Sequence, residues 1–295
     1  MATWGLNTVA LKVLVSHFAP ITMTAFRIFF AGVVVLLTLQ VMKKLRLPTK
    51  EEWLFLIVIS AVHVFLHHAL LATGLTATTA SNTGMIQGLV PVFTAILAIF
   101  FLGDKATLVR TIGFILGFSG VAFIVMSGSG PLGKASYGDL LVLLGFFCQA
   151  AGIILIKKRA AKLDPRLMTG YMFVIGALFL FLTGLIKEPE GIASLSGGSA
   201  FVWFIFIISA IFGTAIGHLI YNHIIGKIGA AEAGIFINFI PFFTLIGAVL
   251  FLNESIGWAQ IMGFILILIG VMLGSGTIEV KRRQHRLVEK SHYNG

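Results

Sequence analysis

Charged residues are scarce in this chain. Asp, Glu, Lys and Arg make up only 11% of its 295 residues, against about 25% in ordinary soluble domains. Hydrophobic residues account for 58%, and the mean hydropathy is +1.02. One soluble core cannot bury that much apolar surface, so we expect the lipid bilayer to be the solvent for most of the chain.

Cysteines and phosphate-binding loops are also lacking. Cys148 is the single cysteine, which excludes a disulfide within the chain. The sequence has no glycine-rich loop that ends in a Walker lysine, so we expect no ATP hydrolysis by this chain. We also expect no bound cofactor. These absences leave a membrane protein whose chemistry must come from polar residues inside apolar segments.

Ten apolar segments approach the length of about 20 residues that a membrane-spanning helix needs. They cover roughly residues 1–16, 20–42, 52–74, 80–102, 107–127, 137–157, 166–186, 201–222, 230–252 and 257–278. The sequence therefore predicts an all-α integral membrane protein with ten transmembrane helices. The first segment is short and has Trp4 near its start, which suggests that a few native residues precede it.

The segment 80–104 returns at 230–254, at a constant offset of 150 residues that continues into the next segment. The coinciding residues include Pro91 and Pro241, Thr94 and Thr244, Asp104 and Glu254, and Gly113 and Gly263. A fixed period with shared prolines, acids and glycines indicates an internal duplication. We therefore divide the chain into a first five-helix repeat over 1–128, a second over 137–278 and a basic tail over 279–295.

Lysine and arginine are distributed unevenly between the linkers. The tail and the linkers after even-numbered segments hold 17 of them, whereas the other linkers hold only Lys134 and Lys187. The positive-inside rule then places both termini in the cytoplasm. The same loops explain the net charge of +10, so we expect contact with the lipid bilayer and no nucleic-acid partner. Five segments per repeat make the two repeats inverted, an arrangement typical of secondary transporters with a site near the midplane.

Several motifs carry a family resemblance. The run WGLNTVALK at 4–12 is followed by Pro20 and Arg27, and the blocks P-x-x-T…L-G-D and P-x-x-T…L-N-E each precede a G-F-I-L…G-V helix. Together they resemble two tandem EamA-type domains of the drug/metabolite transporter superfamily. The resemblance implies a plasma-membrane carrier that exports amino acids or related metabolites through a cavity lined by segments one, three, four, six, eight and nine. The chain departs from the pattern at Gln149, where the second copy lacks the tryptophan of the first.

Polar side chains inside the apolar segments are costly in lipid and usually face a cavity or another helix. The candidates for binding a small-molecule solute are Asn7, His63, Gln87, Gln149, His218 and Asn238. The alternative for each is a plain hydrogen bond between helices. Pro91 and Pro241 lie in mid-segment, and each frees the carbonyl four residues earlier, so we expect a structural kink at both.

Charged residues within or beside the segments allow several roles. No Asp or Glu lies near the middle of a segment, so the candidates for a proton relay are His63 and Glu232. The simplest hypothesis is transport without proton coupling. We then expect a cavity without fixed central charge, which suits a neutral or zwitterionic solute. Lys12 and Arg27 either snorkel to the headgroups or attract a carboxylate. Asp104 and Glu254 are expected to cap the helices that follow them.

Two other function classes stay open. His63, His67 and His68 have metal-ligand spacing, which makes a membrane metalloenzyme an alternative, and a membrane sensor or scaffold without transport is another. Small faces for close helix contact come from Gly113, Gly117, Gly120, Gly263 and Gly270. The resemblance implies that the last helix of each repeat is peripheral and can support a homodimer.

Overall fold

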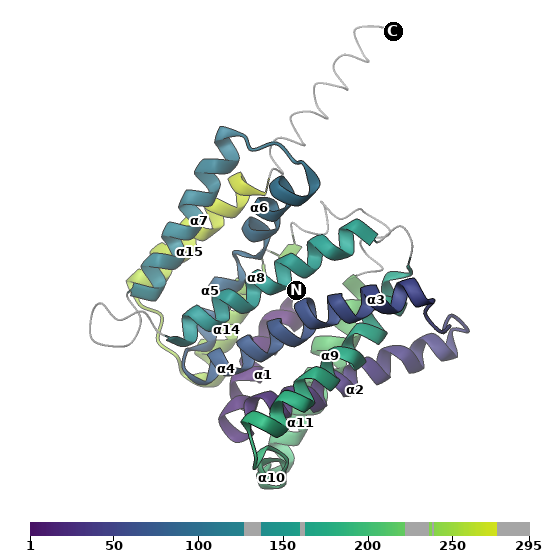
Figure 1. The fold of residues 1–295 in the computed structure, drawn as a ribbon. Coiled ribbons are helices and arrows are strands. Elements are labelled where there is room, and N and C mark those ends of the chain that lie inside the picture. The colour runs from purple at the N-terminus through teal and green to yellow at the C-terminus, as the bar shows by residue number, and fades with distance from the viewer. Residues whose placement is uncertain (127–136, 160–162, 222–235, 238, 276–295) are drawn as a thin grey trace, which may run out of the picture.

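A computed structural model describes residues 1–126, 137–159, 163–221, 236–237 and 239–275 of the chain, and regular structure within these ranges is helical. The helices run back and forth between two ends of one bundle (Figure 1). Seven of the described helices are long and apolar enough to cross a membrane, and two shorter apolar helices follow them. The chain is therefore a multi-pass membrane protein. Asn238, Glu232 and the basic tail lie outside the described residues.

The first five predicted segments are present as helices, close to their expected ends. Two of them are divided into consecutive pieces, because the backbone changes its hydrogen-bond pattern within the segment. The elements are α1 (Ala2–His17), α2 (Pro20–Val41), α3 (Lys50–Ile59), η1 (Ser60–Leu66), α4 (His67–Thr76), α5 (Ala80–Gln87), α6 (Val90–Leu102) and α7 (Leu108–Met126).

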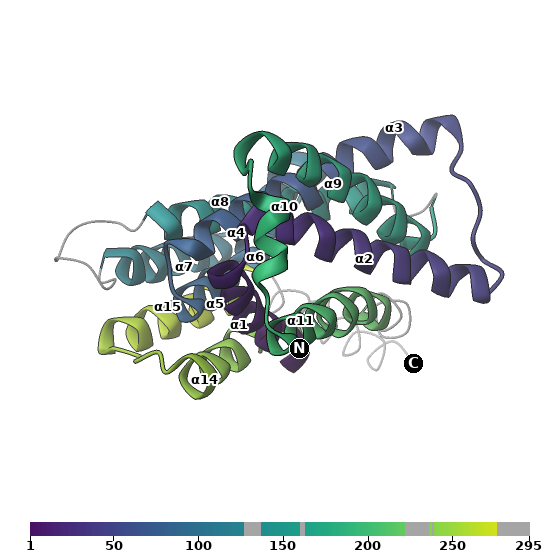
Figure 2. The same ribbon diagram turned by 90° about the horizontal axis from the view of Figure 1, so that it is seen from below.

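The second half follows the same plan, with two short helices added in a loop. Its elements are α8 (Tyr137–Arg159), α9 (Pro165–Lys187), α10 (Gly191–Ser194), η2 (Leu195–Gly197), α11 (Ala200–Ile208), η3 (Ser209–Ile216), α14 (Ile240–Leu252) and α15 (Trp258–Gly274). Figure 2 shows α7 and α15 at one edge of the bundle and α2 and α9 at the other. Buried apolar side chains form two main clusters, one containing Leu14, Met85 and Phe146, and one containing Ile28, Val64 and Phe173.

The 150-residue offset is visible in the backbone. A π-helical segment interrupts the third segment at η1 and the eighth at η3, in overlapping positions of the two copies. The fourth segment breaks after α5, where Leu89 N–H bonds to the Ile86 carbonyl at 3.0 Å, three residues back rather than four. Phe239 N–H bonds to the Phe236 carbonyl in the same way at 3.1 Å. Pro91 and Pro241 occupy the first turns of α6 and α14, where a missing N–H breaks no helical bond.

The ends of α6 and α14 also match. Gly103 and Asn253 close these helices in the left-handed conformation, with φ of 75° and 53°. The next residue of each copy, Asp104 or Glu254, then donates its N–H six residues back, to Ala98 O at 3.3 Å or Ala248 O at 3.2 Å. At both ends these bonds satisfy a carbonyl that the helix itself leaves free.

The glycine faces predicted for close helix contact join α7 to α15 within one chain. A Cβ placed on Gly270 would come within 2.4 Å of Gly117 N and 2.7 Å of Gly113 O, and one on Gly120 would come within 2.6 Å of Gly263 O. Figure 1 shows the two helices side by side. Because these glycines are covered by the partner helix of the same chain, they are not a surface for a second copy.

Replacing Gly270 with alanine tests this contact. The added methyl group would meet backbone atoms of α7 that cannot rotate away, so we expect Gly270→Ala to cost about 1–3 kcal/mol of stability. Gly197→Ala is the control, because a Cβ there has no neighbour within 4 Å, and it should change stability by less than about 0.5 kcal/mol. Thermal unfolding of the two detergent-purified variants measures the difference; equal midpoints would contradict the packing.

Candidate functional site

Carboxylates from distant segments cap two helices at one end of the bundle. Glu254 accepts hydrogen bonds from the N–H groups of Ala80 and Ser81, at 2.8 and 2.9 Å, and from Ser81 Oγ at 2.6 Å. Glu188 does the same for α2: it accepts from Ile21 N and Thr22 N, at 2.9 and 2.7 Å, and from Thr22 Oγ1 at 2.8 Å. Each carboxylate satisfies free N–H groups of a helix N-terminus and favours its dipole. We call this the carboxylate end.

At the carboxylate end, the half-buried ammonium group of Lys12 binds the C-terminus of a helix. Lys12 Nζ donates to the carbonyls of Leu75 and Thr78, at 2.7 and 2.6 Å, just where α4 finishes. These contacts replace the snorkelling that the sequence suggested for Lys12, because the ammonium group binds a helix C-terminus inside the protein. Lysine is a favourable partner there, since the last carbonyls of a helix have no partner in the helix and carry partial negative charge.

Asp139 and Asn82 extend this set of contacts across the bundle. Asp139 accepts hydrogen bonds from Thr78 Oγ1 and from Asn82 Nδ2. Asn82 Oδ1 in turn accepts from Gln260 Nε2 at 2.8 Å. The carboxylate end thus links α5, α8 and α15 through side chains, and the two copies of the repeat are joined there.

The expected roles of Asp104 and Glu254 need correction. Neither caps the helix that follows it: Glu254 reaches α5, 174 residues away, and Asp104 lies 3.6 Å from Arg110 in an ion pair. The start of α15 is capped instead by Gln260, whose Oε1 accepts from Gly257 N at 2.8 Å. Spacing along the chain could not reveal the choice, because the acceptor helix is brought near only by the tertiary fold.

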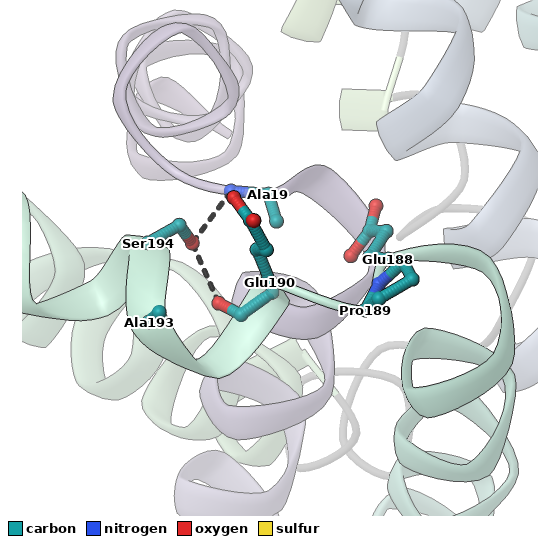
Figure 3. A pocket seen from close by; sticks show the side chains of 7 residues that line it. Ala19, Glu188, Pro189, Glu190, Ala193 and Ser194 are labelled. Carbon is teal, nitrogen blue, oxygen red and sulfur yellow. Dashed lines mark hydrogen bonds between the residues drawn. The ribbon is translucent and has the colours of Figure 1, made fainter.

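A hollow of about 660 Å³ opens beside Glu188 at the same end. Figure 3 shows Ala19, Glu188 to Glu190, Ala193 and Ser194 around it. Ser194 Oγ accepts from Ala19 N at 3.0 Å and donates to Gly191 O at 2.6 Å, while Glu188 is bound to α2. The hollow is open to the surface and is formed by Ala19 and the residues that follow α9.

The middle of the bundle contains a second group of polar residues, which we call the central cluster. Its members are Asn7, Arg27, His63, His67, His68, Ser209, Thr214 and His218. The rings of His67 and His68 lie 4.6 Å apart, and Thr214 contacts both Arg27 and His218. The two π-helical segments contribute His63, Ser209 and Thr214. π-Helical turns inside α-helices occur frequently at functional sites.

Two histidines attach the third segment to α8. His63 Nδ1 donates to the Gln149 carbonyl at 3.1 Å, and His67 Nδ1 donates to the Gly145 carbonyl at 2.9 Å, one turn earlier on α8. Gly152 allows the close approach, because a Cβ there would lie 2.2 Å from His63 Nδ1. A carbonyl can only accept, so both rings carry their proton on Nδ1 and leave Nε2 as an acceptor.

Arg27 lies fully inside the protein. Its side chain is 1% exposed, and Nη1 donates to Thr214 Oγ1 at 2.7 Å and to Ser209 Oγ at 3.5 Å, both on η3. The snorkelling expected for Arg27 is therefore wrong, and so is the expectation of a cavity without fixed central charge. Arg27 comes about 10 Å along α2 from its first residue, by the rise of an α-helix, and its head turns inward to the π-helical segment.

Asn7 and His218, both predicted from sequence, lie against the same η3 segment. Asn7 Oδ1 accepts from Ser209 Oγ at 2.6 Å. His218 Nδ1 donates to the Thr214 carbonyl at 2.8 Å, and its ring lies 5.1 Å from that of Trp4. Gly213 and Gly217 let α1 approach this closely, since a Cβ on either would meet Asn7 or Trp4 within 2.6 Å.

The remaining candidates are less clearly placed. Thr8 Oγ1 donates to Gln87 Oε1 at a long 3.5 Å, and Gln149 joins the cluster through its backbone carbonyl. Asn238 and Glu232 lie outside the described residues. Sequence reasoning missed Ser209 and Thr214, although two hydroxyl groups in an otherwise apolar span, facing an intramembrane arginine, were a signal that could have found them.

The histidine cluster does not have the geometry of a metal site. Nδ1 of both His63 and His67 is used by α8 carbonyls. In the part of the chain that the structure describes, His, Cys, Asp and Glu residues form no group of three that could hold a metal ion. The arrangement is one of hydrogen-bonded helix contacts with free Nε2 atoms inside a membrane bundle.

Comparison with known proteins decides the family. The model of the EamA-like transporter family matches residues 1–126 and 136–276. The chain belongs to the EamA-like transporter family. This EamA-like transporter is 31% identical to "Uncharacterized transporter YyaM" of Bacillus subtilis, over 92% of its own length and 89% of the relative's. It is 27% identical to "WAT1-related protein At3g02690, chloroplastic" of Arabidopsis thaliana, over 92% and 66% of the two chains.

A solved structure supports the fold of this EamA-like transporter. A crystal structure that covers 96% of the chain, and 95% of its own, superposes with a TM-score of 0.68 at 18% identity. At that identity the match concerns the fold alone. The family is one of transporters and not of enzymes, so the metalloenzyme alternative is set aside.

The Glu254 cap provides a test of the carboxylate end. In Glu254→Gln the amide has a single acceptor oxygen and no charge, so it cannot satisfy both N–H groups and the Ser81 hydroxyl. We expect a loss of about 1.5–3 kcal/mol, the usual value for hydrogen bonds to a charged group. Glu190→Gln is the matched control, because Glu190 is exposed and makes no side-chain cap bond. Thermal unfolding of both variants measures the effect; an unchanged midpoint for Glu254→Gln would contradict the cap.

Proposed function

We propose that this EamA-like transporter moves a small polar or amphipathic metabolite, an amino acid or a related compound, outward across the plasma membrane by alternating access to the central cluster. The single observation that carries the proposal is the matched backbone break before Pro91 and Pro241, where the N–H of the residue two positions earlier bonds to the carbonyl three residues back. Broken helices in corresponding positions of two repeats are the usual sign of a transporter binding site, because their free backbone groups line a cavity.

The matched backbone features support two inverted halves within a ten-helix bundle. Breaks before Pro91 and Pro241 recur with the same hydrogen-bond geometry, and so do the π-helical segments. Each half has five predicted spans, so equivalent helices run in opposite directions. Two such halves can rock about a central site and expose it to either side of the membrane in turn.

The central cluster supports the assignment of the site. Its residues come from α1, α2, η1, α4 and η3, and His218 follows η3 directly in the chain. These elements belong to both halves. Their polar atoms would be costly in lipid if they served no partner. Amino acids suit such a site, since it offers the Arg27 cation, amide and hydroxyl groups and histidine Nε2 acceptors.

Solute exchange by purified protein tests the proposed function. Proteoliposomes preloaded with single amino acids should exchange at least one radiolabelled amino acid of a broad panel. We expect alanine at several of Asn7, His63, Gln87, Gln149, His218 and Asn238 to lower that exchange without loss of membrane expression. Flat exchange for the whole panel, in protein shown to be folded, would favour a membrane sensor or scaffold instead.

An imposed pH gradient in the same proteoliposomes tests coupling. We infer uncoupled exchange, because no Asp or Glu lies near the middle of a predicted span. The gradient should then leave the final solute distribution unchanged. Accumulation above equilibrium that follows the proton gradient would contradict this, and its loss in His63→Ala or Glu232→Gln, with exchange retained, would identify the relay.

The orientation of the chain has its own test. We propose that both termini are cytoplasmic, because the linkers on that side and the tail hold 17 basic residues against two on the other side. A reporter that is active only in the cytoplasm, fused after Gly295, should be active. The same reporter fused within the linker 127–136 is the control and should be silent. Activity of the second fusion and silence of the first would reverse the topology.

A further inference from the structure

Arg27 carries two buried hydrogen-bond donors that no described residue uses. Nη1 is bound to Thr214 and Ser209, but Nε and Nη2 have no hydrogen-bond partner. In the described part of the chain, no Asp or Glu forms an ion pair with this guanidinium. A buried donor without a partner is costly, and more so when it is charged. The side chain is thus tied at one nitrogen and unsatisfied at the other two.

The unsatisfied pair has the shape of a carboxylate site. Nε and Nη2 lie along one edge of the planar guanidinium group, and their N–H bonds point the same way. Such an edge binds both oxygens of a carboxylate through two parallel hydrogen bonds. Thr214 holds Nη1, the nitrogen outside this edge. Its hydroxyl therefore fixes the orientation of the guanidinium and leaves the carboxylate-binding edge open.

Other buried polar atoms nearby also lack partners. Thr24 lies three residues before Arg27 and so on the same face of α2, and its Oγ1 is buried without a partner. Trp4 Nε1 is a third unsatisfied group, on α1 where that helix meets Gly217. The nitrogens of Trp4 and Arg27 can only donate. A surplus of donors on two helices that border η3 calls for a ligand rich in acceptors.

We propose that Arg27 binds the carboxylate of the transported solute through Nε and Nη2. The proposal rests on the transport function above and names its substrate class: a small solute with one carboxylate, such as an amino acid or a monocarboxylate. One guanidinium balances one negative charge, whereas a phosphate monoester carries about 1.5 to 2 at neutral pH and would be left partly uncompensated. Since Arg27 is enclosed in this conformation, the solute reaches it when the helices around α2 move apart.

A purely structural role for Arg27 makes different predictions. If the side chain only ties α2 to η3, then Thr214→Val, which removes the Nη1 contact, should act like a change of Arg27 itself. Arg27→Lys keeps the charge and loses the paired donors, and Arg27→Gln loses both. Thr214→Val keeps the charge and the open edge. The three variants therefore separate charge, paired donors and helix contact.

The experiment compares acids with their amides. Thermal unfolding of detergent-purified protein is measured against concentration for propionate and propionamide, leucine and leucinamide, and inorganic phosphate. We expect at least one acid to stabilise the wild type with an apparent affinity at least about 10-fold above its amide, the factor that one hydrogen bond to a charged group supplies. Arg27→Gln should abolish the preference and Arg27→Lys should reduce it. Thr214→Val removes the hydroxyl that orients the guanidinium but keeps both paired donors, so it should lower the apparent affinity for the acid and still leave it above that for the amide.

Exchange of the same acids and amides in proteoliposomes separates this inference from the transport function. Equal exchange of acids and amides by the wild type would overturn the Arg27 assignment and leave transport standing. Acid-specific stabilisation without exchange of any solute would overturn transport and leave the carboxylate site standing. A preference that survives in Arg27→Gln, stabilisation by phosphate above every acid, or no stabilisation by any acid would each overturn the assignment.

Discussion

The structure depends on one constraint: inside a bilayer, each backbone N–H and carbonyl must find its partner within the protein. Continuous helices meet this requirement by themselves, but their ends and breaks do not. This protein meets it at the carboxylate end with side chains from distant segments. Glu254 serves the start of α5, Glu188 serves the start of α2, and Lys12 serves the end of α4.

These partners also join parts of the chain that carry different halves of the duplication. Glu254 follows α14 in the second copy, whereas α5 lies in the first. The Asn82–Gln260 bond links the copies again, and Asp139 connects α8 to the same corner. Charge-assisted bonds therefore hold these parts of the chain together at the carboxylate end. At the edge of the bundle, α7 and α15 pack closely against each other through their glycines.

The central cluster differs from the carboxylate end in its hydrogen bonding. Where the carboxylate end satisfies its polar groups, the cluster leaves Arg27, Thr24 and Trp4 with unpaired atoms in the described structure. A fully buried guanidinium without a carboxylate is expensive, and such a residue in a membrane span is usually functional. The π-helical turn of η3 contributes to this arrangement, because it sets Ser209 and Thr214 facing Arg27 and opens the regular ladder of the helix.

The sequence by itself determined the class of protein and the helices of the described part of the chain, and it predicts the duplication. Hydropathy and length decide the class and the helices, because a segment in lipid has to be apolar and to satisfy its own backbone hydrogen bonds, as an α-helix does. The recurrence of Pro91 as Pro241 can be read from the sequence alone. Asn7, His63 and His218 were predicted from sequence, since polar residues stand out in apolar spans, and the structure places them in the central cluster. Only the tertiary structure decided which partner each polar group takes. Glu254 was expected to cap the next helix and caps one 174 residues away. For Arg27 the sequence left two alternatives, a place at the headgroups or attraction of a carboxylate, and the structure excludes the first by burying the side chain against η3. The physical reason is that a hydrogen-bond partner is chosen by distance in space, and in a bundle of crossing helices that distance is set by the packing of the whole chain.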